Sequence, residues 1–208
     1  MQHAQKMIYS YEVNGLLVQT GDLICTTIGQ AGFIAGELWL LLGKLVPGEV
    51  DHVAIYVGPA GRCVEAVPKG VITFDLEDNL WLAENMREQR QLIDRLVGVA
   101  YPLQAKAWSK AKKIKIRESV AAYCLAQVAA NKRYNYNFFN TRTEAAFYCS
   151  QLVYQAYLPH GIDLNTGLGI PDIAGSHQII FPQEIWSGCC HRRAAEDYNI
   201  ASIMLPII

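Results

Sequence analysis

The chain has 208 residues, of which 51% are hydrophobic and 18% are charged, and its formal net charge is −1. These values are typical of a globular protein with a substantial apolar core. The near-neutral charge gives no support to a polyanion partner such as nucleic acid. One basic run occupies residues 106–117, and a solvated helix face is favoured there over a binding patch.

The first residues contain no charged segment followed by an apolar one, so no export signal is visible and we expect a cytoplasmic location unless a leader has been trimmed. The most apolar stretch, AGFIAGELWLLLGKLV, runs from Ala31 to Val46 and is interrupted by Glu37 and Lys44. It is too short to span a bilayer. We expect a buried or surface-lying helix there, with lipid or membrane contact as one of its possible roles.

Further elements follow in chain order. A turn at residues 20–22 leads into a short strand, and residues 51–57 and 62–67 form a β-hairpin around the turn residues Gly-Pro-Ala-Gly. Strands are also expected at residues 70–74, 96–102 and 200–205, a partly helical segment at 78–94, a long helix at 105–131 and a loop at 131–140. The pattern predicts an α+β fold in a single domain over residues 1–208.

The six cysteines, at positions 25, 63, 124, 149, 189 and 190, form no CxxC pair. Their spacing does not resemble a disulfide framework, and reduced thiols are the simplest interpretation. The pair Cys189–Cys190 precedes His191 but has no second ligand pair at zinc spacing, so a metal site is disfavoured.

The predicted hairpin brings a histidine and a carboxylate together. If Val57 pairs with Arg62, the same register pairs His52 with Val67 and Ala54 with Glu65. Side chains alternate along a strand, so His52 and Glu65 share one face as diagonal neighbours within side-chain reach. A register slip of one residue would place Glu65 on the opposite face.

The segment FYCSQLVYQAY, residues 147–157, has apolar residues at the spacing of one buried helix face, and Cys149 is among them. A cation stabilises a nearby thiolate, and a carboxylate fixes the tautomer of an imidazole, so Cys149, His52 and Glu65 have the residue types needed for acyl transfer through a thioester. From spacing alone, a core cysteine and a structural histidine are favoured over catalysis.

The order of these segments resembles that of the circularly permuted branch of the NlpC/P60 superfamily, the papain-like cysteine hydrolases. The matching stretches are GDLI at 21–24, DHVAIYVG at 51–58, VEA at 64–66 with Gly70 and Val71, YNYN at 134–137, and FYCSQLVY at 147–154. Unpermuted relatives place the cysteine helix before the histidine strand. The resemblance implies a papain-like fold in which a small antiparallel sheet packs on the cysteine-bearing helix.

The resemblance also implies roles for individual residues. Cys149 would be the nucleophile, His52 the base and then the acid, and Glu65 the orienting residue. Tyr134 would line the site and help to bind the oxyanion or the substrate, and Tyr136 would be a wall residue. Loop packing is an equal alternative for both tyrosines, and this mechanism requires no metal or organic cofactor.

One pattern opposes this interpretation. Residues 141–144, TRTE, form a capping-box sequence, and a helix that began there would place Cys149 two turns from its N-terminus. The resemblance favours a later start.

Three functions remain open. The leading one is a cysteine amidase or peptidase that acts on a small peptide, such as a cell-wall-type peptide, or on an N-acyl amino acid. Asp163, Asp172 and Glu184 are candidates to bind the amino group of such a substrate. The alternatives are a lipid acyltransferase or thioesterase, and a non-catalytic binding module on the same fold. For His160 and His177, a core or surface role is favoured.

Overall fold

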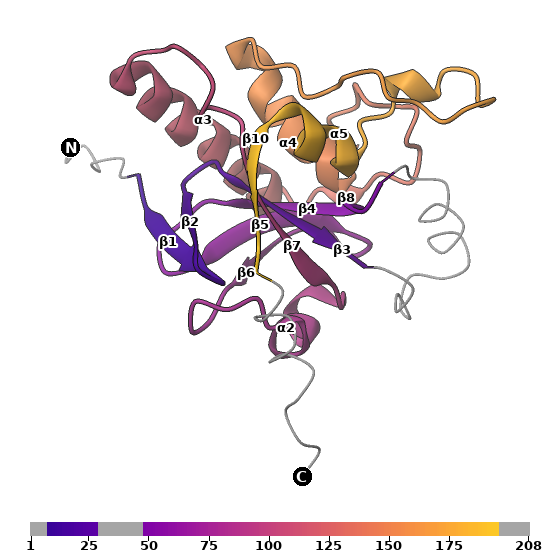
Figure 1. Ribbon diagram of the computed structural model, residues 1–208. Helices are drawn as coiled ribbons and strands as arrows, with labels where there is room; N and C mark the ends of the chain where they lie inside the picture. Colours follow the sequence, from indigo (N-terminus) through magenta and orange to yellow (C-terminus); the bar gives the residue numbers. More distant parts are fainter. Residues whose placement is uncertain (1–7, 29–47, 196–208) are drawn as a thin grey trace.

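The computed structural model of the protein describes residues 8–28 and 48–195 (Figure 1). In this part of the chain, a six-stranded antiparallel sheet has the strand order β10–β7–β3–β4–β5–β6. The strands are β3 (Leu23–Thr27), β4 (His52–Tyr56), β5 (Arg62–Val67), β6 (Gly70–Asp75), β7 (Arg95–Tyr101) and β10 (Cys190–Arg193). The expected helix at 31–46 and the expected strand at 200–205 lie outside the described residues.

Helices cover both faces of this sheet. The helices α3 (Lys110–Ala129), α4 (Cys149–Tyr157) and α5 (Pro182–Gly188) lie over one face, and α2 (Ala83–Arg90) lies under the other (Figure 1). Short 3₁₀ turns follow at η2 (Leu158–His160) and η3 (Ser176–Gln178). The mixed α+β class predicted from the sequence is confirmed.

The alternation of side chains along β4 and β5 creates two separate apolar layers. Val53, Ile55 and Val64 face α3, α4 and α5 within the larger core cluster. Ala54 and Cys63 point the other way, into a smaller cluster that includes residues of α2. The sheet is therefore buried on both faces, which explains why its central strands are apolar at nearly every position.

A separate hairpin precedes the sheet and was not among the expected elements. Its strands are β1 (Ser10–Val13) and β2 (Leu16–Gln19), which pair with Val13 opposite Leu16. Asn14 and Gly15 between them have φ values of 46° and 75°. Positive φ at both central residues is the requirement of the type I′ turn that Asn-Gly favours.

The long helix is shorter than predicted. It begins at Lys110 rather than at residue 105, because the Ser109 hydroxyl accepts a hydrogen bond from the Lys112 N–H over 3.3 Å and caps the helix there. The expected loop at 131–140 contains the short strand β8 (Arg133–Tyr134), which pairs in parallel with β9 (Ala146–Phe147). This pairing places the loop beside the residues that lead into α4.

Candidate active site

Cys149 is the first residue of α4, and its side chain is buried. Tyr148 before it has extended backbone angles, and the first helical hydrogen bond runs from Leu152 N–H to the Tyr148 carbonyl over 3.0 Å. Residues 141–145 are not helical, so the capping-box pattern there does not start the helix. Cys149 thus lies at the positive end of the helix dipole, where negative charge is stabilised.

Several hydrogen bonds hold the start of α4 in place. The side-chain amide oxygen Oε1 of Gln151 accepts from the Tyr148 N–H over 3.3 Å, an arrangement that caps the helix. The Ser150 hydroxyl donates to the carbonyl of Ile180 over 2.7 Å, and the Ile180 N–H donates to the Tyr148 hydroxyl over 3.1 Å. The position of the Cys149 sulfur is therefore determined by both the helix and the segment that passes over its start.

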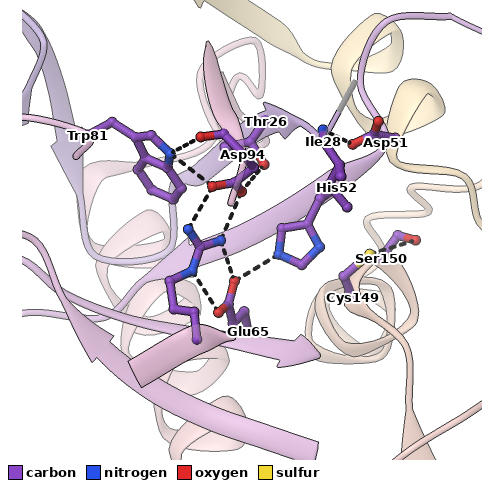
Figure 2. Close-up of polar contacts among 10 residues, drawn as sticks. Thr26, Ile28, Asp51, His52, Glu65, Trp81, Asp94, Cys149 and Ser150 are labelled. Carbon is purple, nitrogen blue, oxygen red and sulfur yellow. Dashed lines mark hydrogen bonds and ion pairs between the residues drawn. The ribbon is translucent and has the colours of Figure 1, made fainter. Parts of the chain in front are cut away.

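His52 is the first residue of β4 and lies between Cys149 and Glu65 (Figure 2). Its Nε2 is 2.8 Å from Oε2 of Glu65, and the other side of its ring faces the Cys149 side chain (Figure 2). Burial alone would lower the pKa of His52, but the charge of the nearby Cys149, together with the hydrogen bond and charge of Glu65, raises it to about 10. The predicted proximity of His52 and Glu65 is confirmed.

The register of the hairpin agrees with the prediction where the two strands pair. The ladder between β4 and β5 joins Ile55 to Val64 and Tyr56 to Cys63, and Val57 N–H donates to the carbonyl of Arg62 over 2.9 Å. The pairs expected closer to the site, His52 with Val67 and Ala54 with Glu65, are not part of the ladder. The His52 and Glu65 side chains nevertheless meet, with Nε2 and Oε2 2.8 Å apart.

The end of β4 that carries His52 is tied to the end of β3. The Asp51 carboxylate accepts from the Ile28 N–H over 2.8 Å (Figure 2). It also accepts from the Thr27 hydroxyl over 3.3 Å. The Asp51 N–H donates to the carbonyl of Thr26 over 3.2 Å. These bonds fix the backbone immediately before His52.

Glu65 is completely buried and forms a bidentate pair with Arg90 at the end of α2. Nε and Nη2 of Arg90 donate to Oε1 and Oε2 of Glu65, each over 2.8 Å. Burial alone would raise the pKa of Glu65, but the charge of Arg90 and the bonds to His52 and Arg90 lower it to about 2. Glu65 is therefore a carboxylate at any physiological pH.

Arg90 also binds a second buried carboxylate. Its Nη1 and Nη2 donate to the two oxygens of Asp94 over 2.7 and 2.9 Å. Asp94 in turn accepts from the Thr26 hydroxyl over 2.7 Å and from the Trp81 indole N–H over 3.1 Å (Figure 2). The guanidinium carbon lies 4.6 Å from the ring centroid of Phe74 and 4.7 Å from that of Trp81. No local sequence pattern predicts this network.

Tyr134 lies beside the nucleophile candidate because β8 pairs with β9, which puts Tyr134 opposite Phe147. Burial, and then the nearby charge of Cys149, raise the pKa of the Tyr134 hydroxyl well above its ordinary value. The ring centroids of Tyr134 and Tyr136 are 4.9 Å apart, and the Tyr136 side chain is exposed. The loop is held to α4 by Asn135, whose side-chain amide Nδ2 donates to the side-chain oxygen Oε1 of Gln151 over 2.9 Å.

A sequence model of the permuted papain-like amidase enzymes, the YaeF/YiiX or C92 family, matches residues 18–169. The chain belongs to this family. No curated protein and no solved structure gives a significant match. The match confirms the permuted papain-like class that the sequence resemblance implied, under the C92 family rather than under NlpC/P60. Membership in a family of amidases supports a cysteine hydrolase in general.

Four of the other cysteines are either buried core thiols or exposed at the surface. Burial raises the pKa values of Cys25, Cys63 and Cys124 above the ordinary value, as expected for core thiols. Cys190 is exposed on β10. Across residues 8–28 and 48–195, no group of three histidine, cysteine or acidic side chains is arranged to hold a metal ion.

The acidic residues that were candidates to bind the substrate, together with His177, differ in exposure. Asp163, Asp172 and His177 are exposed. Glu184 is buried, and its carboxylate accepts from the N–H groups of Thr166, Leu168 and Phe181, so it organises a loop instead of offering a free charge. Within the described part of the chain, none of the helices combines the length and apolar character needed to cross a bilayer.

The stabilising contribution of the His52–Glu65 pair is expected to depend on pH in two directions. The pKa of Glu65 is lowered from 4.5 to about 2, so its contribution is present above pH 4.5 and is lost as the pH falls through 2. The pKa of His52 is raised from 6.5 to about 10, so its contribution is present below pH 6.5 and is lost as the pH rises through 10.

Chemical unfolding of the wild type and of the double variant His52→Gln, Glu65→Gln tests this dependence. The difference in free energy of unfolding between the two proteins should be largest between about pH 4.5 and 6.5 and should shrink on either side. A difference that stays constant across the whole range would contradict these assignments.

Proposed function

We propose that this protein is a cysteine amidase or peptidase that cleaves an amide bond in a small peptide or an N-acyl amino acid through a thioester. The observation that carries the proposal is the arrangement of Cys149, His52 and Glu65. A thiol at a helix start faces an imidazole, and a buried carboxylate binds the opposite side of that imidazole. This is the nucleophile, base and orienter geometry of acyl transfer.

In the proposed first step, the Cys149 thiolate attacks the amide carbonyl carbon. The oxygen becomes an oxyanion, and the carbon–nitrogen bond then breaks as the His52 imidazolium donates a proton to the leaving amine. A thioester and a free amine result. Glu65 keeps the proton on Nε2 of neutral His52, which leaves the lone pair of Nδ1 facing Cys149.

In the second step, His52 accepts a proton from water as the water oxygen attacks the thioester carbon. The carbon–sulfur bond breaks, which releases a carboxylic acid and restores the Cys149 thiolate with His52 as imidazolium. No redox step and no cofactor enter this sequence. The proton taken from water is the one that the next leaving amine receives.

The oxyanion would be stabilised by two donors. The Cys149 N–H belongs to the first turn of α4, where backbone N–H groups have no helical partner. The Tyr134 hydroxyl is close enough for the Cys149 charge to affect its pKa, and a phenol with a raised pKa remains protonated as a donor. Tyr136, exposed beside Tyr134, would form part of the wall that contacts the substrate.

A product screen tests the proposal. Purified protein is incubated with a panel of N-acyl amino acids, short peptides with free amino groups, and acyl lipids, and the products are identified by mass spectrometry. We expect release of a carboxylic acid and an amine from at least one member of the peptide or acyl-amide groups. Lipid turnover alone would favour an acyltransferase or thioesterase, and turnover of nothing on the panel would favour a binding module.

A further inference from the structure

Behind the candidate triad, one buried cation lies between two buried carboxylates. Arg90 uses four donor hydrogens for Glu65 and Asp94, and the side chains of all three residues are fully buried in their ion pairs. Phe74 and Trp81 cover the guanidinium with their rings. Because water does not screen these three buried charges from one another, His52 experiences their sum.

The sum of these charges matters for His52. Oε2 of Glu65 accepts from both His52 and Arg90, so the carboxylate that faces the imidazole is shared with a cation. A Glu65–Arg90 pair alone would be neutral and would give an imidazolium little electrostatic support. Asp94 adds one negative charge on the far side of Arg90, and the network as a whole is then negative.

We propose that Asp94 is a positioning residue for the reaction, which acts through Arg90 and Glu65 to hold His52 in its imidazolium form. Asp94 touches neither the nucleophile nor the imidazole. It neutralises the guanidinium that fixes the direction of the Glu65 carboxylate. Glu65 thereby gains a rigid bidentate anchor and keeps its negative charge available to His52.

The other groups around His52 come from several elements. Cys149 approaches from α4, Glu65 from β5, and Asp51 precedes His52 in the chain with its carboxylate bound to Ile28 and Thr27. Thr26 is the partner of His52 on β3 and donates its hydroxyl to Asp94. Cys149 is the group that must be silenced in a test, because its charge also raises the pKa of His52.

The consequence for turnover rests on the proposed function, but the test does not. In a Cys149→Ser background no thiolate is present and no hydrolysis is measured. The pH titration of the His52 imidazole can be followed there by NMR through its long-range nitrogen–proton couplings. His52→Gln identifies the signal among the five histidines of the chain. A protein with no hydrolytic activity at all still reports on the charge network.

We expect Asp94→Asn in this background to lower the titration midpoint of His52 by roughly one pH unit or more, the order of effect that a nearby buried charge produces. Thr26→Val is the matched control. It removes the 2.7 Å hydrogen bond that the Thr26 hydroxyl donates to Oδ2 of Asp94, and it leaves the charge of the Asp94 carboxylate in place. Its midpoint should stay within about 0.3 pH unit of the background, since no charge changes.

A midpoint that Asp94→Asn leaves unchanged would overturn the proposal, as would an equal shift in Thr26→Val. If Asp94→Asn alone does not fold, the double variant Arg90→Met, Asp94→Asn carries the test. Replacement of a buried ion pair by uncharged side chains is often tolerated. The network then still has a net charge of one negative unit, which Glu65 alone carries. The titration midpoint of His52 should therefore be no lower than in the Cys149→Ser background. A lower midpoint in the double variant would reject the charge account.

Discussion

Replacement of Cys149 by alanine is expected to lower kcat/KM for amide hydrolysis by roughly 10⁴-fold or more, the usual effect of removing the nucleophile of a triad. The reason is that no other described side chain lies at the same helix start against His52. His52→Gln should lower the same parameter by a similar factor, because the two residues act as a unit. The measurement is steady-state turnover of whichever substrate the product screen identifies.

The control for this prediction is Cys124→Ala. Cys124 is a buried thiol on α3 that belongs to the same core cluster but takes no part in the site. Its replacement is expected to leave kcat/KM nearly unchanged. Hydrolysis by Cys149→Ala at more than about a hundredth of the wild-type rate would contradict a thioester mechanism, since the residual activity of triad knockouts is far lower.

Replacement of Arg90 by methionine is expected to destabilise the protein by about 3–5 kcal/mol, the cost of leaving a buried ion without its partner. Glu65 and Asp94 would remain buried without the cation that binds both of them. The stem of methionine fills part of the volume between Phe74 and Trp81, so most of the loss comes from charge rather than from a cavity. Urea unfolding of the wild type and of Arg90→Met at neutral pH measures this loss in the free energy of unfolding.

The pair Arg62–Asp75 provides the matched comparison. Both side chains are about half exposed, at 48% and 44%, so the same arginine-to-methionine change removes an ion pair of similar length from water instead of from the core. Arg62→Met should cost less than about 1 kcal/mol. Equal effects of the two substitutions would mean that the Arg90 network contributes no more to stability than a surface pair.

The candidate site depends on two features of local sequence that can be predicted. The β-branched and aromatic residues of β4, with the Gly-Pro-Ala-Gly turn, define the hairpin register and hence the meeting of His52 and Glu65. The heptad-like apolar spacing after residue 147 identifies α4. The order of the segments identifies the permuted papain-like class, which the family match confirms.

The Arg90–Asp94 network could not be predicted in the same way. Arg90 and Asp94 are separated from Glu65 by a whole strand, a loop and a helix, and a charged pair four residues apart is common on exposed helices. Only the packing of α2 under the sheet shows that this particular pair is buried. A long-range contact between single residues leaves no periodic pattern in the sequence.

The start of α4 illustrates a conflict that local patterns do not resolve. The sequence contains a capping box at residues 141–144, but these residues lie in a loop that Gln151 binds through the carbonyls of Asn140 and Thr143. Tertiary hydrogen bonds thus outweigh a local capping preference. In contrast, the Asn-Gly turn of the β1–β2 hairpin is a local signal that two residues of sequence are enough to indicate.

The most direct test of the central claim is the rate of iodoacetamide alkylation at Cys149 as a function of pH, measured by peptide mass spectrometry on the wild type and on His52→Ala. Cys190, exposed on β10, is the reference thiol in the same sample. We predict that at about pH 6, well below the ordinary thiol pKa of about 8.5, Cys149 reacts several-fold faster than Cys190, and that His52→Ala removes this advantage. A Cys149 that reacts more slowly than Cys190 at every pH, or at a rate that His52→Ala does not change, would contradict an activated cysteine–histidine pair.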